Sequence, residues 1–302
     1  MSIGVQTYKV QEERQLMEKV KDYMALVKLR LSLLVVFSSL MGYLYASSAN
    51  VDWVTLVALL IGGFLVTAAS NAFNQVYEID IDAQMNRTKD RPIPAGRMSA
   101  TEGMIAGFIM SIVGFVILLN YVNPACAIMG ALSLLCYVFA YTPLKRISHI
   151  ATLVGAIPGA MPFVIGWFAF GGQFQFEVLV LFLIQFVWQF PHTWAIAWLQ
   201  REDYKKVNIK LNPYRNEEDK KTAYNILLYT LVLIPASLMP LIYGFTHIAS
   251  AIILLIIGLY FFNKARNLYI NQSNANARGV LIGSIVYLPL VQIALVLDKV
   301  FI

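Results

Sequence analysis

The chain has 302 residues, of which 59% are hydrophobic and only 13% are charged, roughly half the charged share of an ordinary soluble domain. This composition excludes a water-soluble globular domain as the main part of the protein. The net charge of +6 would suit a nucleic-acid-binding protein, but a membrane explains the positions of the basic residues better, and no nucleic-acid partner is expected.

Long apolar runs recur through the chain, each approaching the ~20 residues that cross a ~30 Å hydrocarbon core. Breaking these runs at polar clusters predicts an all-α integral membrane protein with nine transmembrane helices in one polytopic membrane domain, 1–302. Residues 1–24 are expected to form a cytoplasmic N-terminal segment. The nine spans are predicted at about 25–46, 53–73, 102–120, 123–142, 151–170, 177–199, 223–244, 247–265 and 279–297.

The N-terminal segment argues for a bacterial membrane. It lacks the short apolar region and small-residue cleavage site of a secretion signal, and its acidic residues are atypical of mitochondrial transit peptides. All but one of the 23 basic residues, Lys299, fall in or next to this segment, or in or at the edge of the connections that follow the even-numbered spans. The lack of targeting features predicts the bacterial cytoplasmic (inner) membrane. The positive-inside rule then predicts that the N-terminus and those connections lie in the cytoplasm.

Chemistry is expected in the long inner loops, 74–101 and 200–222. In the first loop, Asn74, Glu78 and Asp82 are spaced by four, so on a continuous helix they form one polar stripe with neighbours ~6 Å apart. Such a stripe can hold Mg²⁺ through oxygen atoms, together with substrate phosphates. The alternative, a solvated helix end, is disfavoured because acids near a helix C-terminus oppose its dipole.

Basic residues follow the acidic stripe. Carboxylates that hold a cation, next to Arg and Lys that take phosphate charge, match the needs of a metal-bound diphosphate. Arg87 and Arg91 are predicted to contact this diphosphate, and Lys145 and Arg146 of the next inner loop are further candidates. The same cations also fix topology, and both roles can hold.

The middle of the chain offers packing features. Cys126 and Cys136 lie ten residues apart in one apolar run and are interpreted as packing residues, neither a zinc pair nor a disulfide. Gly155 and Gly159 are expected to allow close backbone approach between helices. Pro158 and Pro162 are expected to kink the same helix beside a cavity. The alternative is that the whole segment serves ordinary helix packing.

His192 lies within the sixth span, where an ionisable residue is a functional candidate by default. The alternative is a histidine satisfied by a neighbouring helix. In the loop that follows, Glu202 and Asp203 are about 100° apart on a helix, so only one faces a site. We predict that Asp203 does and that it joins the metal ligands, with Arg201 as a further diphosphate contact.

Several motifs together resemble the UbiA-type intramembrane prenyltransferases, and within them the branch that farnesylates heme. The resemblance covers roughly residues 25–300. The matching text is Asn74-x-x-x-Glu78-x-x-x-Asp82-x-x-Met-x-Arg87-Thr-x-x-Arg91-Pro, Tyr141-Thr-Pro-Leu-Lys-Arg146, Gly155-Ala-Ile-Pro-Gly-Ala, Trp188-Gln-x-Pro-His192 and Ala197-Trp-Leu-x-Arg201-Glu-Asp-Tyr204. Glu78 stands where the family usually has Asp. The glutamate keeps the negative charge and adds a methylene group to the side chain.

The resemblance implies a nine-helix bundle with a central cavity open to the cytoplasmic side. It implies transfer of a farnesyl group from farnesyl diphosphate to a vinyl group of protoheme IX (heme B), with diphosphate release. Mg²⁺ would be the cofactor, held by Asn74, Glu78 and Asp82, and heme would be a substrate. His192 would orient heme, ligate its iron or move a proton. A heme A synthase or a terminal oxidase assembly is a further partner that the resemblance suggests.

Two other functions compete with this interpretation. A prenyltransferase of the same family could act on an aromatic quinone precursor instead of heme. A transporter with an ion site at the membrane midplane is less consistent with the sequence, because it predicts ionisable residues deep in several spans, whereas nearly all acids here fall in inner loops.

Overall fold

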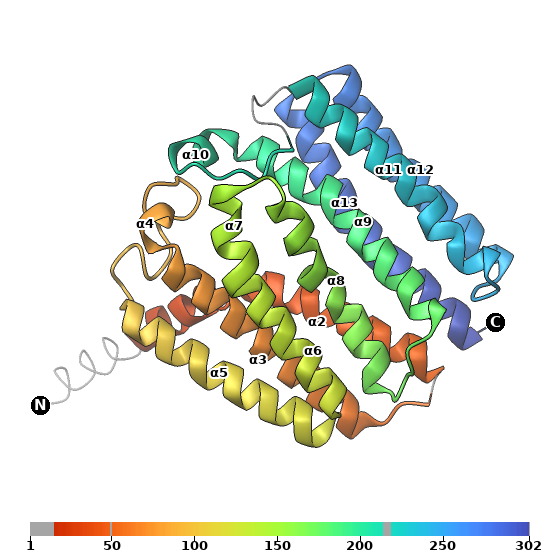
Figure 1. Cartoon of the computed structure of the whole chain (residues 1–302), viewed down its shortest axis with the longest axis horizontal. Helices are drawn as coiled ribbons and strands as arrows, with labels where there is room; N and C mark the ends of the chain where they lie inside the picture. Colours follow the sequence, from red (N-terminus) through yellow and green to blue (C-terminus); the bar gives the residue numbers. More distant parts are fainter. Residues whose placement is uncertain (1–14, 49, 214–218, 302) are drawn as a thin grey trace, which may run out of the picture.

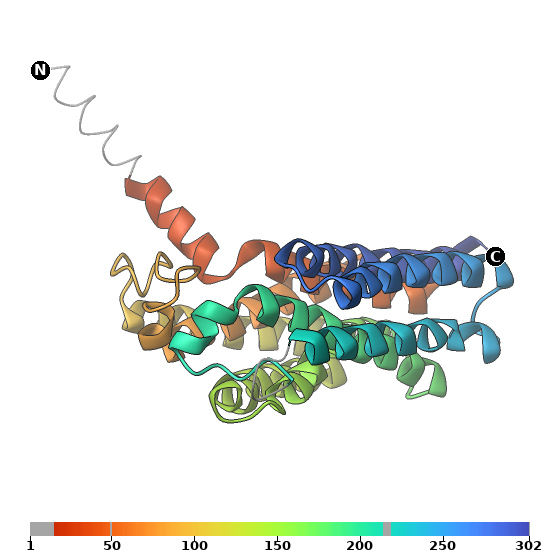
Figure 2. The same ribbon diagram turned by 90° about the horizontal axis from the view of Figure 1, so that it is seen from above.

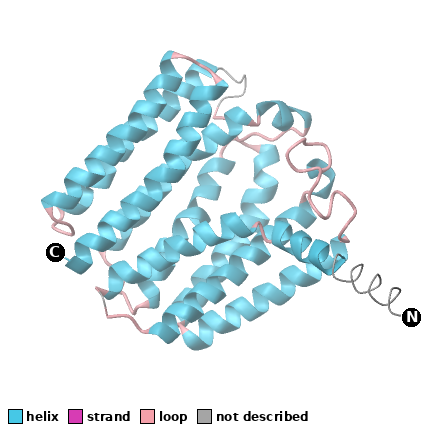
Figure 3. Cartoon of the chain, turned by 180° about the vertical axis from the view of Figure 1, so that it is seen from behind, coloured by secondary structure: helices cyan, strands magenta, loops and turns pink. Residues whose placement is uncertain are grey.

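The structure is a computed structural model that describes residues 15–48, 50–213 and 219–301. In this part of the chain it is all-α (Figure 3), and nine of its helical stretches are long and apolar enough to cross a membrane. The predicted number of spans is therefore confirmed, and so is the fold class. The spanning helices are α2 (Leu29–Ser47), α3 (Trp53–Tyr77), α5 (Ala100–Tyr121), α6 (Pro124–Leu135) continued by η1 (Cys136–Tyr141) and α7 (Thr142–Ile147), α8 (Ala151–Ala169), α9 (Phe176–Leu199), α11 (Asp219–Ile242), α12 (Ile248–Ile270) and α13 (Asn274–Phe301).

Polar residues in the short connections begin several of these helices. The side chain of Asp52 accepts hydrogen bonds from the backbone N–H groups of the first turn of α3. Ser99 does the same for α5, and Asn123 for α6, where its Oδ1 lies 2.9 Å from the N of Cys126. N-caps of this kind satisfy donors that a helix start leaves free, which explains why the chain turns at these places.

The start of the first span differs from the prediction. Instead of one helix from residue 25, residues 15–26 form a separate helix, which projects away from the bundle in Figure 2. Lys28 then adopts a left-handed backbone conformation, with φ of 47°, and α2 begins at Leu29. Residues 1–14 of the predicted cytoplasmic segment lie outside the described residues.

Side chains of α3 explain this break. The Nε2 of Gln75 donates to the carbonyl oxygens of Ala25 and Leu26, at 3.2 and 2.6 Å. The Nδ2 of Asn71 donates to the carbonyl oxygen of Val27 at 3.3 Å. These carbonyls would otherwise accept hydrogen bonds from the next helical turn, so α3 holds the chain where it enters the bundle.

The helix α8 lies at the centre of the bundle, in contact with α2, α6 and α9. A Cβ atom on Gly166 would overlap the carbonyl oxygen of Ser39, and one on Gly42 would overlap that of Phe163. Only glycine permits α2 and α8 to pack this closely, as small residues generally do between membrane helices. The prediction of close backbone approach was therefore placed on the wrong glycines, because Gly155 contacts a side chain instead.

The fourth span widens near its inner end. Residues Cys136–Tyr141 are π-helical, and Pro143 follows in the first turn of α7. In a regular α-helix the ring of Pro143 would clash with the carbonyl of Phe139, and a π-helical stretch relieves such clashes by adding a residue to the turn. Both cysteines of this span are free, as predicted, and the thiol of Cys126 donates to the carbonyl oxygen of Ile165 at 3.3 Å.

Two short helices lie at one end of the bundle (Figure 1), namely α4 (Ile79–Asp82) and α10 (Arg201–Lys206). Buried apolar residues from both, including Ile81 and Tyr204, pack in one cluster with Ala151 at the start of α8. The two long inner loops, although far apart in sequence, are thereby brought together over the ends of α3, α8 and α9.

Candidate active site

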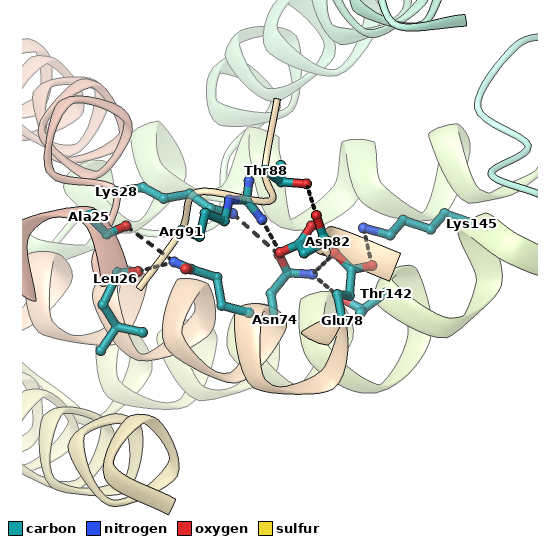
Figure 4. Close-up of polar contacts among 11 residues, drawn as sticks. Ala25, Leu26, Lys28, Asn74, Glu78, Asp82, Thr88, Arg91, Thr142 and Lys145 are labelled. Carbon is teal, nitrogen blue, oxygen red and sulfur yellow. Dashed lines mark hydrogen bonds and ion pairs between the residues drawn. The ribbon is translucent and has the colours of Figure 1, made fainter. Parts of the chain in front are cut away.

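The polar stripe lies at the junction of α3 and α4. Asn74 belongs to the last turn of α3, Glu78 ends this helix with φ of −104° and ψ of 15°, and Asp82 ends α4. The expected continuous helix is thus broken at Glu78, yet the three side chains still gather in one place (Figure 4). They are almost fully buried, at 2%, 4% and 1% exposure.

Hydrogen bonds link the first two members of the stripe. The Nδ2 of Asn74 donates to Oε2 of Glu78 at 3.0 Å and to Oγ1 of Thr142 at 3.3 Å. The other carboxylate oxygen of Glu78 forms an ion pair with the ammonium of Lys145. A buried carboxylate requires such partners, because desolvation of an isolated charge is costly. Lys145, one of the predicted diphosphate contacts, therefore lies directly beside the stripe.

Asp82 has one engaged and one unengaged oxygen. Its Oδ2 pairs with the guanidinium of Arg91, and Oγ1 of Thr88 donates to its backbone carbonyl oxygen at 2.9 Å. Its Oδ1 is buried and has no hydrogen-bond partner. A buried, unpartnered carboxylate oxygen is rare in proteins and points to a ligand at this position. Arg91, like Lys145, is thus close to where a metal-bound diphosphate would lie.

The structure adds Lys28, which sequence reasoning did not select. Its Nζ donates to Oδ1 of Asn74 at 3.3 Å, and Figure 4 shows Lys28 and Arg91 on one side of the stripe and Lys145 on the other. The pKa of Lys28 is lowered to about 7, mainly because burial disfavours its charged form and also because the two other cations repel it, while the carboxylates act in the opposite direction. Lys28 falls inside the predicted first span. An ionisable residue within a span is a functional candidate, and this signal could have selected Lys28 from the sequence.

Asp203 faces the first inner loop, whereas its neighbour Glu202 points outward, with a side chain that is 76% exposed. The Oδ2 of Asp203 accepts from the backbone N–H of Arg87 at 3.3 Å, and its Oδ1 accepts from Nζ of Lys206 at 2.8 Å. The pKa of Asp203 is lowered, chiefly by the hydrogen bond from Lys206. Asp203 thus connects α10 to the loop that carries the predicted phosphate contacts.

The other predicted diphosphate residues occupy different surroundings. Arg87 is exposed, and its backbone N–H donates to Asp203 of α10. Arg146 is exposed on α7. Arg201 forms an ion pair with Asp219 at 3.0 Å, at the start of α11. Of these three arginines, Arg87 is the one that belongs to the loop beside the stripe.

His192 lies on α9 and contacts α13. Its Nδ1 is 2.8 Å from Oγ of Ser284, and its ring stacks on Trp188 with centroids 4.7 Å apart. The indole Nε1 of Trp188 donates to the carbonyl oxygen of Ser284 at 2.8 Å. A neighbouring helix therefore supplies a partner for the imidazole, and the structure does not bring His192 to the carboxylate stripe.

A mainly apolar cavity of about 230 Å³ adjoins the stripe and runs between α2, α3, α6, α8 and α9. Asn71, one helical turn from Asn74, lies on its wall, as do Gly63 and Thr67 further along α3. Pro158 and Pro162 also line it, as expected for prolines beside a cavity. An elongated apolar ligand with a charged end would fit such a site, with its charge at the stripe and its chain in the cavity.

The oxygen atoms of the stripe suit a divalent cation that substrate phosphates also bind. Among the described residues, no group of three or more His, Cys, Asp and Glu side chains could hold a metal ion by itself. Mg²⁺, however, is usually held by one or two carboxylates together with substrate phosphates and water. The unpartnered Oδ1 of Asp82, with Glu78 and the amide oxygen of Asn74 next to it, fits that pattern.

Comparisons with known proteins agree with this geometry. The model of the UbiA prenyltransferase family matches residues 35–285. A protein of Cytophaga hutchinsonii named protoheme IX farnesyltransferase is 46% identical over 279 residues, which cover 92% of this chain and 98% of the relative. A protein of the same name from Flavobacterium psychrophilum is 44% identical and is covered to 94% of its length.

Solved structures share the fold. A digeranylgeranylglyceryl phosphate synthase aligns with a TM-score of 0.77 over 94% of this chain and 100% of its own, at 21% identity. A UbiA homologue from Archaeoglobus fulgidus bound to GPP and Mg²⁺ aligns with a TM-score of 0.65 over 91% of this chain and 99% of its own, at 14% identity. At these identities the likeness establishes the architecture of the bundle.

Proposed function

The chain belongs to the UbiA prenyltransferase family, and from that membership we propose that it transfers a farnesyl group from farnesyl diphosphate to a vinyl group of protoheme (heme B), giving heme O and diphosphate. The observation that carries this proposal is a buried stripe of Asn74, Glu78 and Asp82, flanked by cations and one helical turn from an apolar cavity that Asn71 lines. Identity above 40% to two proteins named protoheme IX farnesyltransferase supports heme as the acceptor.

In this proposal the stripe positions the diphosphate. Asn74, Glu78 and Asp82 would hold Mg²⁺, which would supply positive charge to neutralise the departing diphosphate. Arg91, Lys145 and Lys28 contact the carboxylates and the amide. The same three side chains are within reach of phosphate oxygens beside the stripe, where their charge-assisted hydrogen bonds would favour the departing diphosphate.

The reaction balances with water as co-reactant. The bond between the first farnesyl carbon and the diphosphate oxygen breaks, and its electron pair leaves with the diphosphate. The π electrons of the heme vinyl group form the new carbon–carbon bond, water adds to the cation left beside the porphyrin ring, and a proton is released. The burial of the stripe and the apolar cavity would limit earlier attack of water on the allylic cation.

The protein is a multi-pass membrane protein. We place it in the bacterial inner membrane with the stripe facing the cytoplasm, because the inner loops that carry α4 and α10 are rich in Lys and Arg, whereas the opposite connections are almost free of them. A heme A synthase or an oxidase assembly is the class of partner that would take up the product.

The acceptor can be tested by incubating the purified protein with farnesyl diphosphate and Mg²⁺, and with either protoheme or a hydroxybenzoate. We expect a farnesylated product with protoheme alone. A prenylated hydroxybenzoate without a heme product would replace heme with a quinone precursor as the acceptor, within the same family.

A further inference from the structure

The N-terminal helix, residues 15–26, carries an apolar face that the rest of the described chain leaves uncovered. Leu16, Met17, Val20 and Met24 form this face, and their exposure ranges from 45% to 66%. These residues are spaced by three and four, so they lie on one side of the helix. An exposed apolar face with polar residues beside it is typical of a binding surface.

Polar contacts hold the N-terminal helix at the start of α5. The Oδ1 of Asp22 accepts from Nε of Arg97 at 2.9 Å, and the hydroxyl of Tyr23 donates to Oε1 of Glu102 at 2.8 Å. Lys19 forms an ion pair with the same carboxylate at 3.4 Å. Glu102 lies in the first turn of α5, which is a membrane-spanning helix. These contacts therefore place the N-terminal helix at a boundary of the membrane.

The chain passes from this helix directly into the membrane. The spanning helix α2 begins three residues after Leu26, and its first turns expose Leu31, Leu33 and Leu34. Figure 2 shows the N-terminal helix running obliquely away from the spanning helices and not alongside them. An amphipathic helix at this position can lie along the membrane surface, with its apolar face toward the acyl chains.

The last turn of the N-terminal helix is connected to the carboxylate stripe. Leu26 is fully buried, and its carbonyl oxygen accepts from Nε2 of Gln75 at 2.6 Å. Only Val27 separates Leu26 from Lys28, whose Nζ donates to Oδ1 of Asn74 at 3.3 Å. A change in the direction of the helix would therefore move Lys28 relative to the stripe.

We propose that the N-terminal helix binds the surface of the phospholipid bilayer through Leu16, Met17, Val20 and Met24, and that this contact holds Lys28 at the stripe. The partner is the boundary between lipid headgroups and acyl chains, because the helix is attached to the starts of two spanning helices, α2 and α5. The link to Lys28 rests on the proposed function, whereas the contact with the bilayer does not.

The contact with the bilayer is tested with spin labels on the full chain in nanodiscs of phosphatidylethanolamine and phosphatidylglycerol. The labels are attached to Val20→Cys or Gln15→Cys, in a protein whose two native cysteines are changed to serine. Gln15 is the matched control, because it is also exposed but lies about 140° from Val20 around the helix.

We expect the label at position 20 to respond mainly to oxygen, which concentrates among acyl chains, and the label at position 15 mainly to a water-soluble nickel chelate. A stronger response to nickel at both positions would overturn the contact with the bilayer. A label at position 20 that is shielded from both reagents would also overturn it, by showing that a protein segment or a second copy of the chain covers this face.

The link to Lys28 is tested by placing a charge on the apolar face. Val20→Asp should weaken binding of farnesyl diphosphate with Mg²⁺ by about threefold or more, because a carboxylate is disfavoured among acyl chains and the helix would turn away from them. Gln15→Asp adds the same charge on the opposite side and should bind as wild type. In a Lys28→Met background, Val20→Asp should cause no further loss, because both substitutions act through the same side chain.

Losses that multiply in the double variant would overturn the link to Lys28. Unchanged binding in Val20→Asp would overturn it as well. Farnesyl diphosphate binding that follows the expected pattern, without formation of a heme product, would support the inference and reject heme as the acceptor.

Discussion

The ammonium of Lys28 lies 3.3 Å from Oδ1 of Asn74, so a residue that precedes the first membrane-spanning helix completes the cationic border of the stripe. Replacing Lys28 with Met should raise KM for farnesyl diphosphate by about 10-fold or more, because a charge-assisted hydrogen bond typically contributes ~1.5–3 kcal/mol. Steady-state kinetics at fixed protoheme would measure this. The control is Lys21→Met, because Lys21 is an exposed lysine of the preceding helix. An unchanged KM for Lys28→Met would show that Lys28 does not belong to the site.

Asp82→Asn should reduce farnesyl transfer by about 100-fold or more while the protein remains folded. The substitution keeps the shape but removes the charge from the side chain whose Oδ1 is buried without a partner. Product formation and the thermal unfolding midpoint are measured together. Asp80→Asn provides the comparison, since Asp80 belongs to the same short helix but is exposed. Normal turnover by Asp82→Asn would refute the metal assignment.

Asp203 and Glu202 should differ sharply in mutational effect. Asp203→Asn weakens the contact with the backbone of Arg87, so we expect at least a tenfold loss in kcat/KM for farnesyl diphosphate. Glu202→Gln should stay within twofold of wild type, because its side chain is 76% exposed. Comparable losses in the two variants would show that α10 acts through its total charge and not through the contact made by Asp203.

Gly166→Ala should destabilise the bundle. The added methyl would overlap the carbonyl oxygen of Ser39 and force α2 and α8 apart, at a cost of about 1–3 kcal/mol. Thermal unfolding in detergent would report this loss. Gly63→Ala is the matched variant, because a Cβ atom at Gly63 meets nothing within 4 Å. If both variants unfold at the wild-type temperature, the close crossing of α2 and α8 does not contribute to stability.

The number of spanning helices could be predicted from the sequence because long apolar runs are local signals. The break at Lys28 could not be predicted this way. It depends on Gln75 and Asn71, which lie on another helix and bind the carbonyls of residues 25–27. The π-helical turn before Pro143 likewise interrupts a run that reads as one continuous span.

The candidate site could be predicted only in part. The spacing of Asn74, Glu78 and Asp82 was visible in the sequence, and the structure brings these side chains together. Two of the cations beside them, Arg91 and Lys145, were among the predicted diphosphate contacts. Lys28 was not predicted, because it reaches the stripe only through tertiary packing. His192 looked functional as an ionisable residue in a span, yet the structure places its ring against Ser284 of α13.

The most direct test of the proposed function is a single turnover experiment with the purified protein, protoheme, farnesyl diphosphate and Mg²⁺, analysed by mass spectrometry. The proposal predicts a heme product that is heavier by one farnesyl group and one hydroxyl, formed with an equal amount of diphosphate and lost when the metal is chelated. Unchanged protoheme in the presence of an otherwise folded, substrate-binding protein would contradict it.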